Sequence, residues 1–570
     1  MGDEEQGVLI DERADERAFP TMLLTDQAVV FGHGTEPPRP HRASEQRAIP
    51  IASRCIEVRR CDGAGWQYRA VAQITRRAAL DVTLGPYTAA GLVFFASAGV
   101  LVVEIVALRL LAPYFGLTLE TSTMVIAIAL GAIATGSWTG GRLADRVPPL
   151  SLVGPLLAVS GAVVALTPAL VRVTASTGSA GLLSIVAALM IFVPGVLLAA
   201  VTPLVTKLSL RSLEQTGTVV GRLSGISTAG SIVGTVLTGF VLITRVPVSG
   251  IMIGLGLALV AVAVVLMGLS RRRLVVLPVA ALVLGGLGVA TVPSGCDLET
   301  AYHCAAVRSD PERSSGRTLE LDGAPHSYVD LADATYLEYD YVRGVVATID
   351  SAFPSGVPLR AHHLGGGGLT VPHYLAATRP GTESTVSEID PGVLRLDRER
   401  LGLDADDGIE VTVEDARLGL DRLGSDGVDL VVGDAFGGVS VPWHLTTREA
   451  VEKIERVLTD DGVYVLNVID SGSMDFARAE AATLAGEFEH VAVASEPAVV
   501  DRTNGQRGAN VVLAASNRPL AGEAVAARMQ QLGTDWSVVT GERAAEWWGD
   551  AVSLTDDYAP VDQLLDPFGT

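Results

Sequence analysis

Basic residues are scarce in this chain compared with acidic ones. There are 42 Lys and Arg residues against 64 Asp and Glu residues, which gives a net charge of −22 at pH 7. A chain of phosphates would be repelled by this charge, so we expect no nucleic-acid partner. The same charge disfavours a polyanionic ligand on the soluble surface, whereas a cationic small molecule is compatible with it.

Cysteine is also rare, and its spacing argues against a metal site. The four cysteines form no CxxC pair and have no histidines at matching spacing, so we expect no bound metal. Cys296 and Cys304 are close enough in the sequence to form a disulfide on an oxidising face. Two unrelated thiols are the alternative, because the sequence does not give their geometry.

The first 85 residues lack an apolar run long enough to cross a bilayer. They also lack the charged, apolar and cleavage regions of a signal peptide. A Pro-rich, charged stretch lies within them at 36–50, and we expect residues 1–85 to form a disordered tail. An overcalled gene start is the alternative.

Charge becomes scarce between residues 86 and 292. The whole chain has a mean hydropathy of +0.38 and 19% charged residues, and its apolar residues are concentrated in this range. Since a span needs roughly 20 apolar residues, we expect a membrane domain of about seven helices. The expected ranges are 87–113, 121–141, 150–171, 180–206, 223–244, 247–269 and 273–292. Gly230 and Gly234 stand at GxxxG spacing, which allows two helices in lipid to approach closely.

The distribution of Lys and Arg predicts an orientation in the cell membrane. One set lies before the first expected helix and in every second loop: Arg76, Arg77, Arg142, Arg146, Lys207, Arg211 and Arg271–Arg273. The alternate loops hold only Arg172 and Arg245. This pattern predicts a multi-pass protein with a cytoplasmic N-terminus, and seven spans would then place the C-terminal domain outside. An enzyme that uses a cytoplasmic donor needs that domain inside, so the sequence leaves its side open.

Residues 293–570 have the pattern of a soluble α/β domain. A small β-rich lead-in is expected over 293–345, with a β-like run at 318–321, and a Rossmann-like domain over 346–570. Strands are expected at 359–364, 385–389, 410–413, 428–432, 463–468 and 511–514. Helical stretches between them predict a mostly parallel, doubly wound sheet, whose ligands bind at the carboxyl ends of the strands. The expected fold class is thus a multi-span helical membrane domain fused to an α/β Rossmann-like domain with a small N-terminal β element.

Three expected strand ends carry candidate ligand residues. Leu364-Gly-Gly-Gly-Gly368 lets the backbone approach a ligand without Cβ clashes. Glu388-Ile-Asp390 ends the next strand, where a carboxylate suits two ribose hydroxyls. Glu414-Asp415-Ala416 ends another strand and could accept a hydrogen bond from an adenine amino group. Each alone is typical of a strand-end turn, but the three in this order predict a nucleoside site.

A fourth strand end makes a resemblance specific. Asp434 follows the expected strand at 428–432, at the mouth of the same pocket. With Leu319-Glu-Leu-Asp-Gly323 and the three earlier strand ends, it occurs in the order seen in spermidine synthase-like aminopropyltransferases. Two further segments look like the membrane-fused branch of that family: Val441-Pro-Trp-His-Leu-Thr-Thr-Arg-Glu449 and Leu554-Thr-Asp-Asp-Tyr-Ala-Pro560. The resemblance covers nearly all of 87–570.

The resemblance implies an activity and roles for named residues. It implies transfer of an aminopropyl group from decarboxylated S-adenosylmethionine to a diamine such as putrescine, with Asp434 as the proton acceptor. It places Gly365, Gly366, Gly367, Glu388, Asp390, Asp415 and Ala416 at the donor, and His326 and Tyr339 at the amine substrate. The sulfonium already activates the carbon, so no metal or redox cofactor is implied. Family members are commonly oligomeric, so a homo-oligomer is expected.

The chain also departs from the family pattern. The family loop Gly-Gly-Gly-Asp-Gly-Gly lacks its acid here, where Gly365-Gly-Gly-Gly368-Leu369-Thr370 stands. His326 or a neighbour stands where a glutamine is usual, Tyr339-Asp340-Tyr341 replaces Tyr-His-Glu, and Gly437 replaces the second acid near Asp434. The acids that hold the diamine are thus fewer, while the nucleoside features persist. A catalytically silent sensor or transport-coupled module that binds a nucleoside or polyamine is therefore the alternative. A methyltransferase shares the sheet and the glycine loop, but Asp434 lacks a following Pro-Pro-Tyr-type element.

Overall fold

The computed structural model describes residues 84–565 with short gaps. The gaps are 116–118, 211–212, 269–278, 281–282, 284, 289, 292–294, 439, 504 and 506. The disordered tail expected over 1–85 therefore lies outside the described residues, except for residues 84 and 85.

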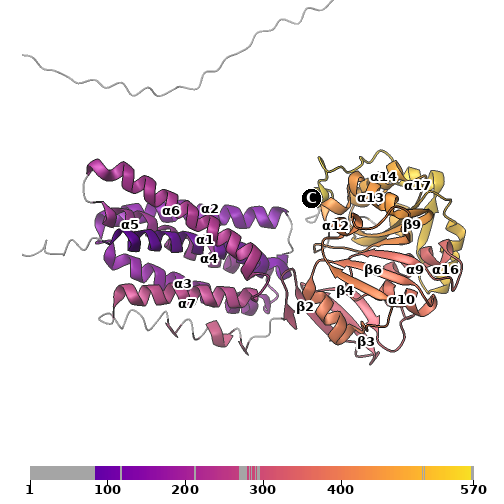
Figure 1. Cartoon of the computed structure of the whole chain (residues 1–570), viewed down its shortest axis with the longest axis horizontal. Helices are drawn as coiled ribbons and strands as arrows, with labels where there is room; N and C mark the ends of the chain where they lie inside the picture. Colours follow the sequence, from indigo (N-terminus) through magenta and orange to yellow (C-terminus); the bar gives the residue numbers. More distant parts are fainter. Residues whose placement is uncertain are drawn as a thin grey trace, which may run out of the picture. The chain divides into compact units, whose positions relative to one another are not determined.

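Long apolar helices form the first part of the described chain (Figure 1). They are α1 Pro86–Phe115, α2 Leu119–Arg146, α3 Leu150–Ala175, α4 Ala180–Ala199, α5 Val201–Ser209, α6 Thr216–Leu237 with a π-helical turn Thr238–Leu242, and α7 Val248–Met267. The described residues contain 6 helices long and apolar enough to cross a membrane, with α4 and α5 in one of them. Each of these overlaps an expected span. The expected span 273–292 lies mostly outside the described residues, and its described residues, 279–280, 283, 285–288 and 290–291, are helical.

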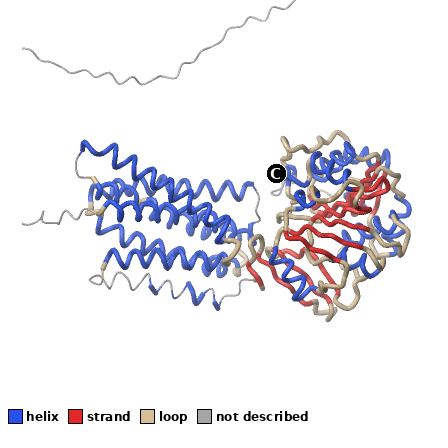
Figure 2. The backbone as a smooth tube through the Cα atoms, in the orientation of Figure 1, coloured by secondary structure: helices blue, strands red, loops and turns tan. Residues whose placement is uncertain are grey.

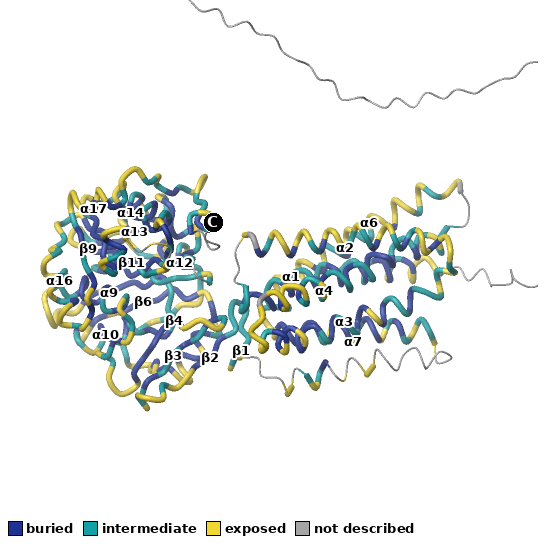
Figure 3. The backbone as a smooth tube through the Cα atoms, turned by 180° about the vertical axis from the view of Figure 1, so that it is seen from behind, coloured by how far each residue is buried: buried dark blue, intermediate teal, exposed yellow. Residues whose placement is uncertain are grey.

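Glycines set the contact between α1 and α6. A Cβ added at Gly230 would lie 2.4 Å from the carbonyl oxygen of Phe94, and one at Gly234 would lie 2.7 Å from that of Ala98. The GxxxG contact expected from the sequence is therefore confirmed. Only Leu223 joins these two glycines as a buried residue of α6, so this helix leaves most of its surface exposed (Figure 3). Small residues are what permit such close backbone approach.

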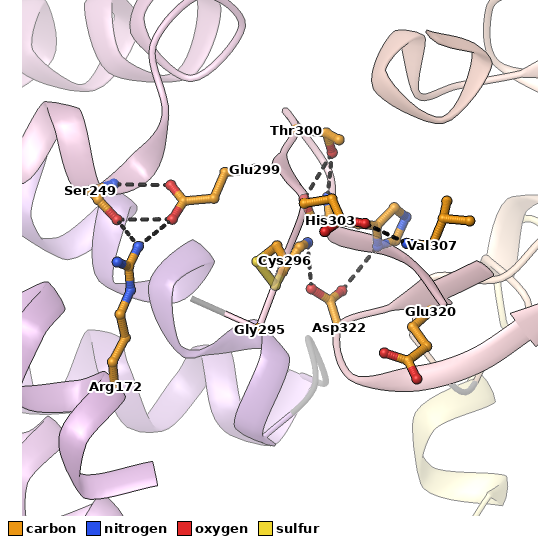
Figure 4. Close-up of a disulfide and its surroundings, with 12 residues drawn as sticks. Arg172, Ser249, Gly295, Cys296, Glu299, Thr300, His303, Val307, Glu320 and Asp322 are labelled. Carbon is orange, nitrogen blue, oxygen red and sulfur yellow. Dashed lines mark hydrogen bonds and ion pairs between the residues drawn. A yellow bond between two sulfur atoms is a disulfide. The ribbon is translucent and has the colours of Figure 1, made fainter. Parts of the chain in front are cut away.

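The β-rich lead-in is a four-stranded antiparallel sheet with strand order β1-β2-β3-β4. Its strands are β1 Leu298–Glu299, β2 Cys304–Ser309, β3 Gly316–Leu321 and β4 Ala324–Asp330. A disulfide joins Cys296 and Cys304 and closes the turn between β1 and β2 (Figure 4). Of the two alternatives that the sequence left open, the bridged pair is the one found.

The second sheet has eight strands in the order β12-β10-β11-β9-β8-β5-β6-β7. Strands are drawn in red in Figure 2. The strands are β5 Arg360–Leu364, β6 Glu383–Glu388, β7 Ile409–Val413, β8 Val428–Gly433, β9 Leu458–Asp470, β10 His490–Ser495, β11 Ala509–Ser516 and β12 Ser537–Thr540. Strands β9 to β7 are parallel, but β11 is antiparallel to β9 and β10, and β12 is antiparallel to β10. The sheet is therefore mixed: four of its seven strand pairs are parallel, as expected for a mostly parallel sheet, and the three pairs at the β12 edge are antiparallel. Strands β10 and β12 lie outside the expected strand ranges.

Helices cover both faces of this sheet, and inner strands such as β8 and β11 are therefore buried almost continuously along their length. The helices are α9 Asp340–Ala352, α10 Thr370–Thr378, α11 Pro391–Leu396, α12 Ala416–Leu420, α13 Arg448–Val457, α14 Asp475–Glu487, α15 Pro497–Val500, α16 Gly522–Gln531, α17 Gly541–Trp548 and α18 Val561–Leu564, with a short π turn at Asp397–Leu401 and a 3₁₀ turn at Trp443–Leu445. A further 3₁₀ turn, Leu213–Gln215, lies between α5 and α6. On strand β8, Val431 packs with α13, α14 and α17, while Leu430 and Val432 pack with α9, α10 and α16.

The chain reverses its direction across the sheet between β5 and β8. It runs outward from β5 through β6 to β7 and then returns to place β8 on the other side of β5. Ligands of such sheets bind at this reversal, beyond the carboxyl ends of the strands. The sequence after β5 is the glycine loop, and Asp434 directly follows β8.

Candidate active site

The glycine loop after β5 is packed against neighbouring backbone. Gly365 has φ +91°, and a Cβ there would lie 2.7 Å from the carbonyl oxygen of Asp434. Only glycine adopts this conformation at such close range without strain. The amide of Asp434 donates a hydrogen bond of 3.0 Å to the carbonyl oxygen of Leu364. The reversal point of the sheet therefore holds the loop and Asp434 side by side.

Glu388 ends β6, and its carboxylate is fixed by the backbone. Gly366 N donates to Glu388 Oε2 at 2.8 Å, and Asp390 N donates to Oε1 at 2.8 Å. The side chain is buried, and this burial raises the pKa of the Glu388 carboxyl while the two amide bonds oppose the rise. A carboxylate held in this way presents a rigid acceptor to a ligand.

Asp390 lies in a different environment from Glu388. Its Oδ1 accepts a hydrogen bond of 2.8 Å from Gly392 N, which caps the first turn of α11, and its Oδ2 accepts one from the Thr300 hydroxyl. Asp390 is fully buried and does not line either of the cavities described below. Its carboxylate is therefore engaged within the protein, although the sequence placed it at the donor.

Asp415 follows β7 and also begins a helix. Its Oδ1 accepts hydrogen bonds from Arg417 N at 2.9 Å and Leu418 N at 3.2 Å, which caps α12. Its Oδ2 lies 2.9 Å from His444 Nε2. Sequence reasoning named Asp415 and Ala416 but not His444, although His444 lies in the segment that carried the family resemblance.

Asp434 makes two hydrogen bonds through its carboxyl group. Asn467 Nδ2 donates to Oδ1 at 2.9 Å, and the Tyr341 hydroxyl donates to Oδ2 at 3.4 Å. Desolvation raises the pKa of Asp434 to about 6, and the two donors oppose that rise. A carboxyl with this pKa is ionised at neutral pH and is basic enough to accept a proton.

Two cavities meet at Asp434. The smaller one, of about 100 Å³, is lined by Glu388, Asp415, Ala416 and His444 among others. The larger one, of about 450 Å³, is lined by residues from the lead-in and from strands β5, β8, β9 and β11 of the main sheet, among others. Five residues line both cavities: His326, Gly365, Gly367, Asp434 and Phe436. Asp434 is thus open to both sides.

His326 and Tyr339, the two residues expected at the amine substrate, both line the larger cavity. Burial lowers the pKa of His326 to about 4, so its imidazole is neutral at pH 7. Tyr339 stacks on Tyr341 with ring centroids 6.0 Å apart. The hydroxyl of Tyr341 also lies 3.1 Å from the carbonyl oxygen of His326, so its single proton is shared between this oxygen and Asp434 Oδ2. Sequence reasoning noted Tyr341 within the motif but gave it no role.

The larger cavity is acidic and aromatic. Asp340, Asp434 and Glu496 line it, together with Tyr339, Tyr341, Phe436 and Trp536, and its lining within the described chain includes no Lys or Arg. In the part of the chain that the structure describes, no group of three or more His, Cys, Asp or Glu side chains is arranged to hold a metal ion. The chemistry of this lining suits an organic cation.

Comparisons with known proteins give one match in sequence. No family model matches the chain. Over 218 residues the chain is 29% identical to the polyamine aminopropyltransferase of Vibrio vulnificus (strain CMCP6), and the match covers 36% of this chain and 70% of that protein.

Solved structures of spermidine synthases overlap this chain more loosely. A probable spermidine synthase from Corynebacterium glutamicum ATCC 13032 shares 26% identity at a TM-score of 0.43, over 45% of this chain and 95% of that one. Spermidine synthase from Thermotoga maritima shares 16% identity at a TM-score of 0.28, over 38% of this chain and 69% of that one. The sequence match agrees with the motifs at the strand ends, and together they support a similarity of this chain to the spermidine synthase-like family.

Proposed function

We propose that this protein transfers an aminopropyl group from decarboxylated S-adenosylmethionine to a diamine, with putrescine as the first acceptor to test. The observation that carries the proposal is the position of Asp434, which lines both cavities. The smaller cavity would hold the nucleoside of the donor, with Glu388 at the ribose and Asp415 at the adenine. The larger cavity would hold the amine.

The proposed reaction is a displacement at carbon. The lone pair of the amine nitrogen forms a bond to the methylene carbon next to the sulfonium. The carbon–sulfur bond breaks, and its electron pair stays on sulfur to give a neutral thioether, 5′-methylthioadenosine. The amine proton passes to the Asp434 carboxylate, whose raised pKa suits a general base near neutral pH. Holding both substrates at this junction replaces an encounter in solution by an oriented reaction.

The test is Asp434→Asn in the full chain, purified in detergent. We expect the formation of 5′-methylthioadenosine from decarboxylated S-adenosylmethionine and putrescine to fall by about 10²- to 10⁴-fold, because the amide cannot accept the proton. Asp429→Asn is the matched control, since Asp429 lies on β8, the strand that Asp434 follows, and pairs with Arg360 at a partly exposed position. Unchanged turnover in Asp434→Asn would sink the catalytic assignment.

We further infer that the helices α1 to α7 cross a lipid bilayer and anchor the α/β domain to a membrane. Their length and composition support this, as do the large apolar side chains exposed on α6, such as Ile232 and Phe240. The protein should stay in the membrane fraction after an alkaline wash and leave it only with detergent. Release by the wash would contradict a spanning anchor.

A further inference from the structure

A row of polar side chains crosses four adjacent strands beside the larger cavity. Asp434 follows β8, Asn467 lies on β9, Asn510 lies on β11 and Glu496 follows β10, and these strands are neighbours in the sheet. Asn510 Nδ2 donates to Asn467 Oδ1 at 3.0 Å, and Asn467 Nδ2 donates to Asp434 Oδ1 at 2.9 Å. All four residues line the larger cavity.

The strand directions bring Glu496 to the same edge of the sheet as Asp434. Strand β10 is antiparallel to β11, β11 is antiparallel to β9, and β9 is parallel to β8. Strands β10 and β8 therefore run the same way, and the residues after them, Glu496 and Asp434, both stand at carboxyl ends. Three strand spacings separate β8 from β10, which is roughly 14 Å between their backbones.

Three carboxylates line this cavity, Asp340, Asp434 and Glu496, and among the described residues only Glu496 has no side-chain partner. Its side chain is half-buried, and no hydrogen bond or ion pair joins it to another residue in the described ranges. Asp340, by contrast, pairs with Arg343 at 2.8 Å, and Asp434 accepts from Asn467 and Tyr341.

Among the described residues that line the cavity with Glu496, none supplies a positive charge to neutralise it. The described lining of the cavity contains no Lys or Arg. Its two histidines are neutral at pH 7, because burial lowers the pKa of His326 to about 4 and that of His363 to about 3. A free carboxylate in a cavity of this kind attracts an ammonium group.

We propose that Glu496 binds the distal ammonium group of the acceptor, while Asp434 faces the amine that reacts. The acceptor is then a linear amine with a cationic nitrogen at each end. Glu496, which follows β10, takes the place of the second acid of the family pattern, which is Gly437 in this chain. This inference rests on the proposed function. The inference extends the proposed function by naming the residue that distinguishes a diamine from a monoamine.

The test compares two acceptors with the same carbon chain, putrescine and butylamine, in full-length wild type and Glu496→Gln. We expect Glu496→Gln to raise the KM for putrescine by about 10- to 100-fold, the effect of losing one hydrogen bond to a charged group. The kcat for putrescine and the kcat/KM for butylamine should stay within about twofold of wild type, because the reacting end is untouched. Glu496→Asp should recover part of the loss, since it restores the charge.

Glu489→Gln is the matched control, because Glu489 is exposed just before the opposite end of the same strand. An equal effect of Glu496→Gln on both amines, or no effect on either, would overturn the role of Glu496 and leave the proposed function standing. Calorimetric binding of putrescine with 5′-methylthioadenosine present gives a readout without turnover. Binding that Glu496→Gln weakens about 10-fold or more would support the inference even if no product forms. Wild type that neither binds nor converts putrescine would overturn both proposals.

Discussion

Asn467, on strand β9, donates a hydrogen bond of 2.9 Å to the carboxyl group of Asp434, the residue that follows strand β8. The amide stabilises the ionised form of Asp434 and so opposes the rise in its pKa that desolvation causes. Burial therefore raises the proton affinity of the proposed base, and a neighbour that carries no charge itself lowers it again in part.

The first prediction concerns the pH dependence of turnover. The base must be ionised, so kcat/KM should rise with pH through a midpoint of about 6 and level off above it. Asn467→Ala removes a donor to the ionised form, so the midpoint should move to higher pH by about one unit. Asn517→Ala is the control, because Asn517 lies beyond the other end of β11. An unchanged pH midpoint in Asn467→Ala would contradict the role assigned to Asn467.

The second prediction concerns the glycine loop. Gly365→Ala would place a methyl group 2.7 Å from the carbonyl oxygen of Asp434, at φ +91°. We expect this variant to lose binding of 5′-methylthioadenosine, because the loop must move away from β8. Gly356→Ala is the control, since Gly356 has φ +74° but nothing within 4 Å of an added Cβ. Gly356→Ala should introduce only a backbone strain of about 1–2 kcal/mol. Equal binding of 5′-methylthioadenosine by the two variants would contradict the prediction.

The third prediction concerns the side of the membrane that the α/β domain faces. Arg172, in the last turn of α3, donates to Glu299 of β1 at 2.7 Å, and both contact Ser249 of α7 (Figure 4). The lead-in therefore meets the bundle at the end where α3 stops and α7 begins. Basic residues lie at the opposite end of the bundle. There, Lys207 of α5 pairs with Asp145 near the end of α2, and Arg222 of α6 donates to the carbonyl oxygen of Pro86 at the start of α1.

Since basic residues favour the cytoplasmic side, we expect the α/β domain to lie on the other side. The disulfide between Cys296 and Cys304 agrees with an oxidising environment. Paired C-terminal fusions, one reporter active only in the cytoplasm and one only outside it, measure this directly. An active cytoplasmic reporter would contradict the expectation and would give the enzyme direct access to its donor in the cell. An active external reporter would mean that the reaction in the cell depends on donor from outside.

The sequence by itself determined the two halves of the chain and most of the strand ends. Helix spans follow from long apolar runs, because a helix in lipid must satisfy its own backbone and present apolar side chains. The contacts of Gly230 and Gly234 with α1 were readable from spacing alone. The glycine loop, Glu388, Asp415 and Asp434 were readable because each follows an apolar strand, and the carboxyl ends of parallel strands meet at one edge.

Only the tertiary structure decided which of these residues face a cavity. Glu388 and Asp390 are two positions apart on one segment, yet Glu388 lines the smaller cavity while Asp390 caps α11 and binds Thr300 from the lead-in. Their spacing suits either role, and the choice depends on a contact between residues 90 positions apart.

The antiparallel edge of the sheet was equally hidden in the sequence. Strand β10 lacks a motif and pairs with β11 and β12, which follow it, so the place of Glu496 depends on pairings that local pattern does not encode. The row from Asp434 to Glu496 exists because four strands that are consecutive in the chain, β8 to β11, take the order β8-β9-β11-β10 in the sheet. Sequence periodicity specifies which residues can be buried, whereas strand order, which follows from packing of the whole domain, specifies which of them meet.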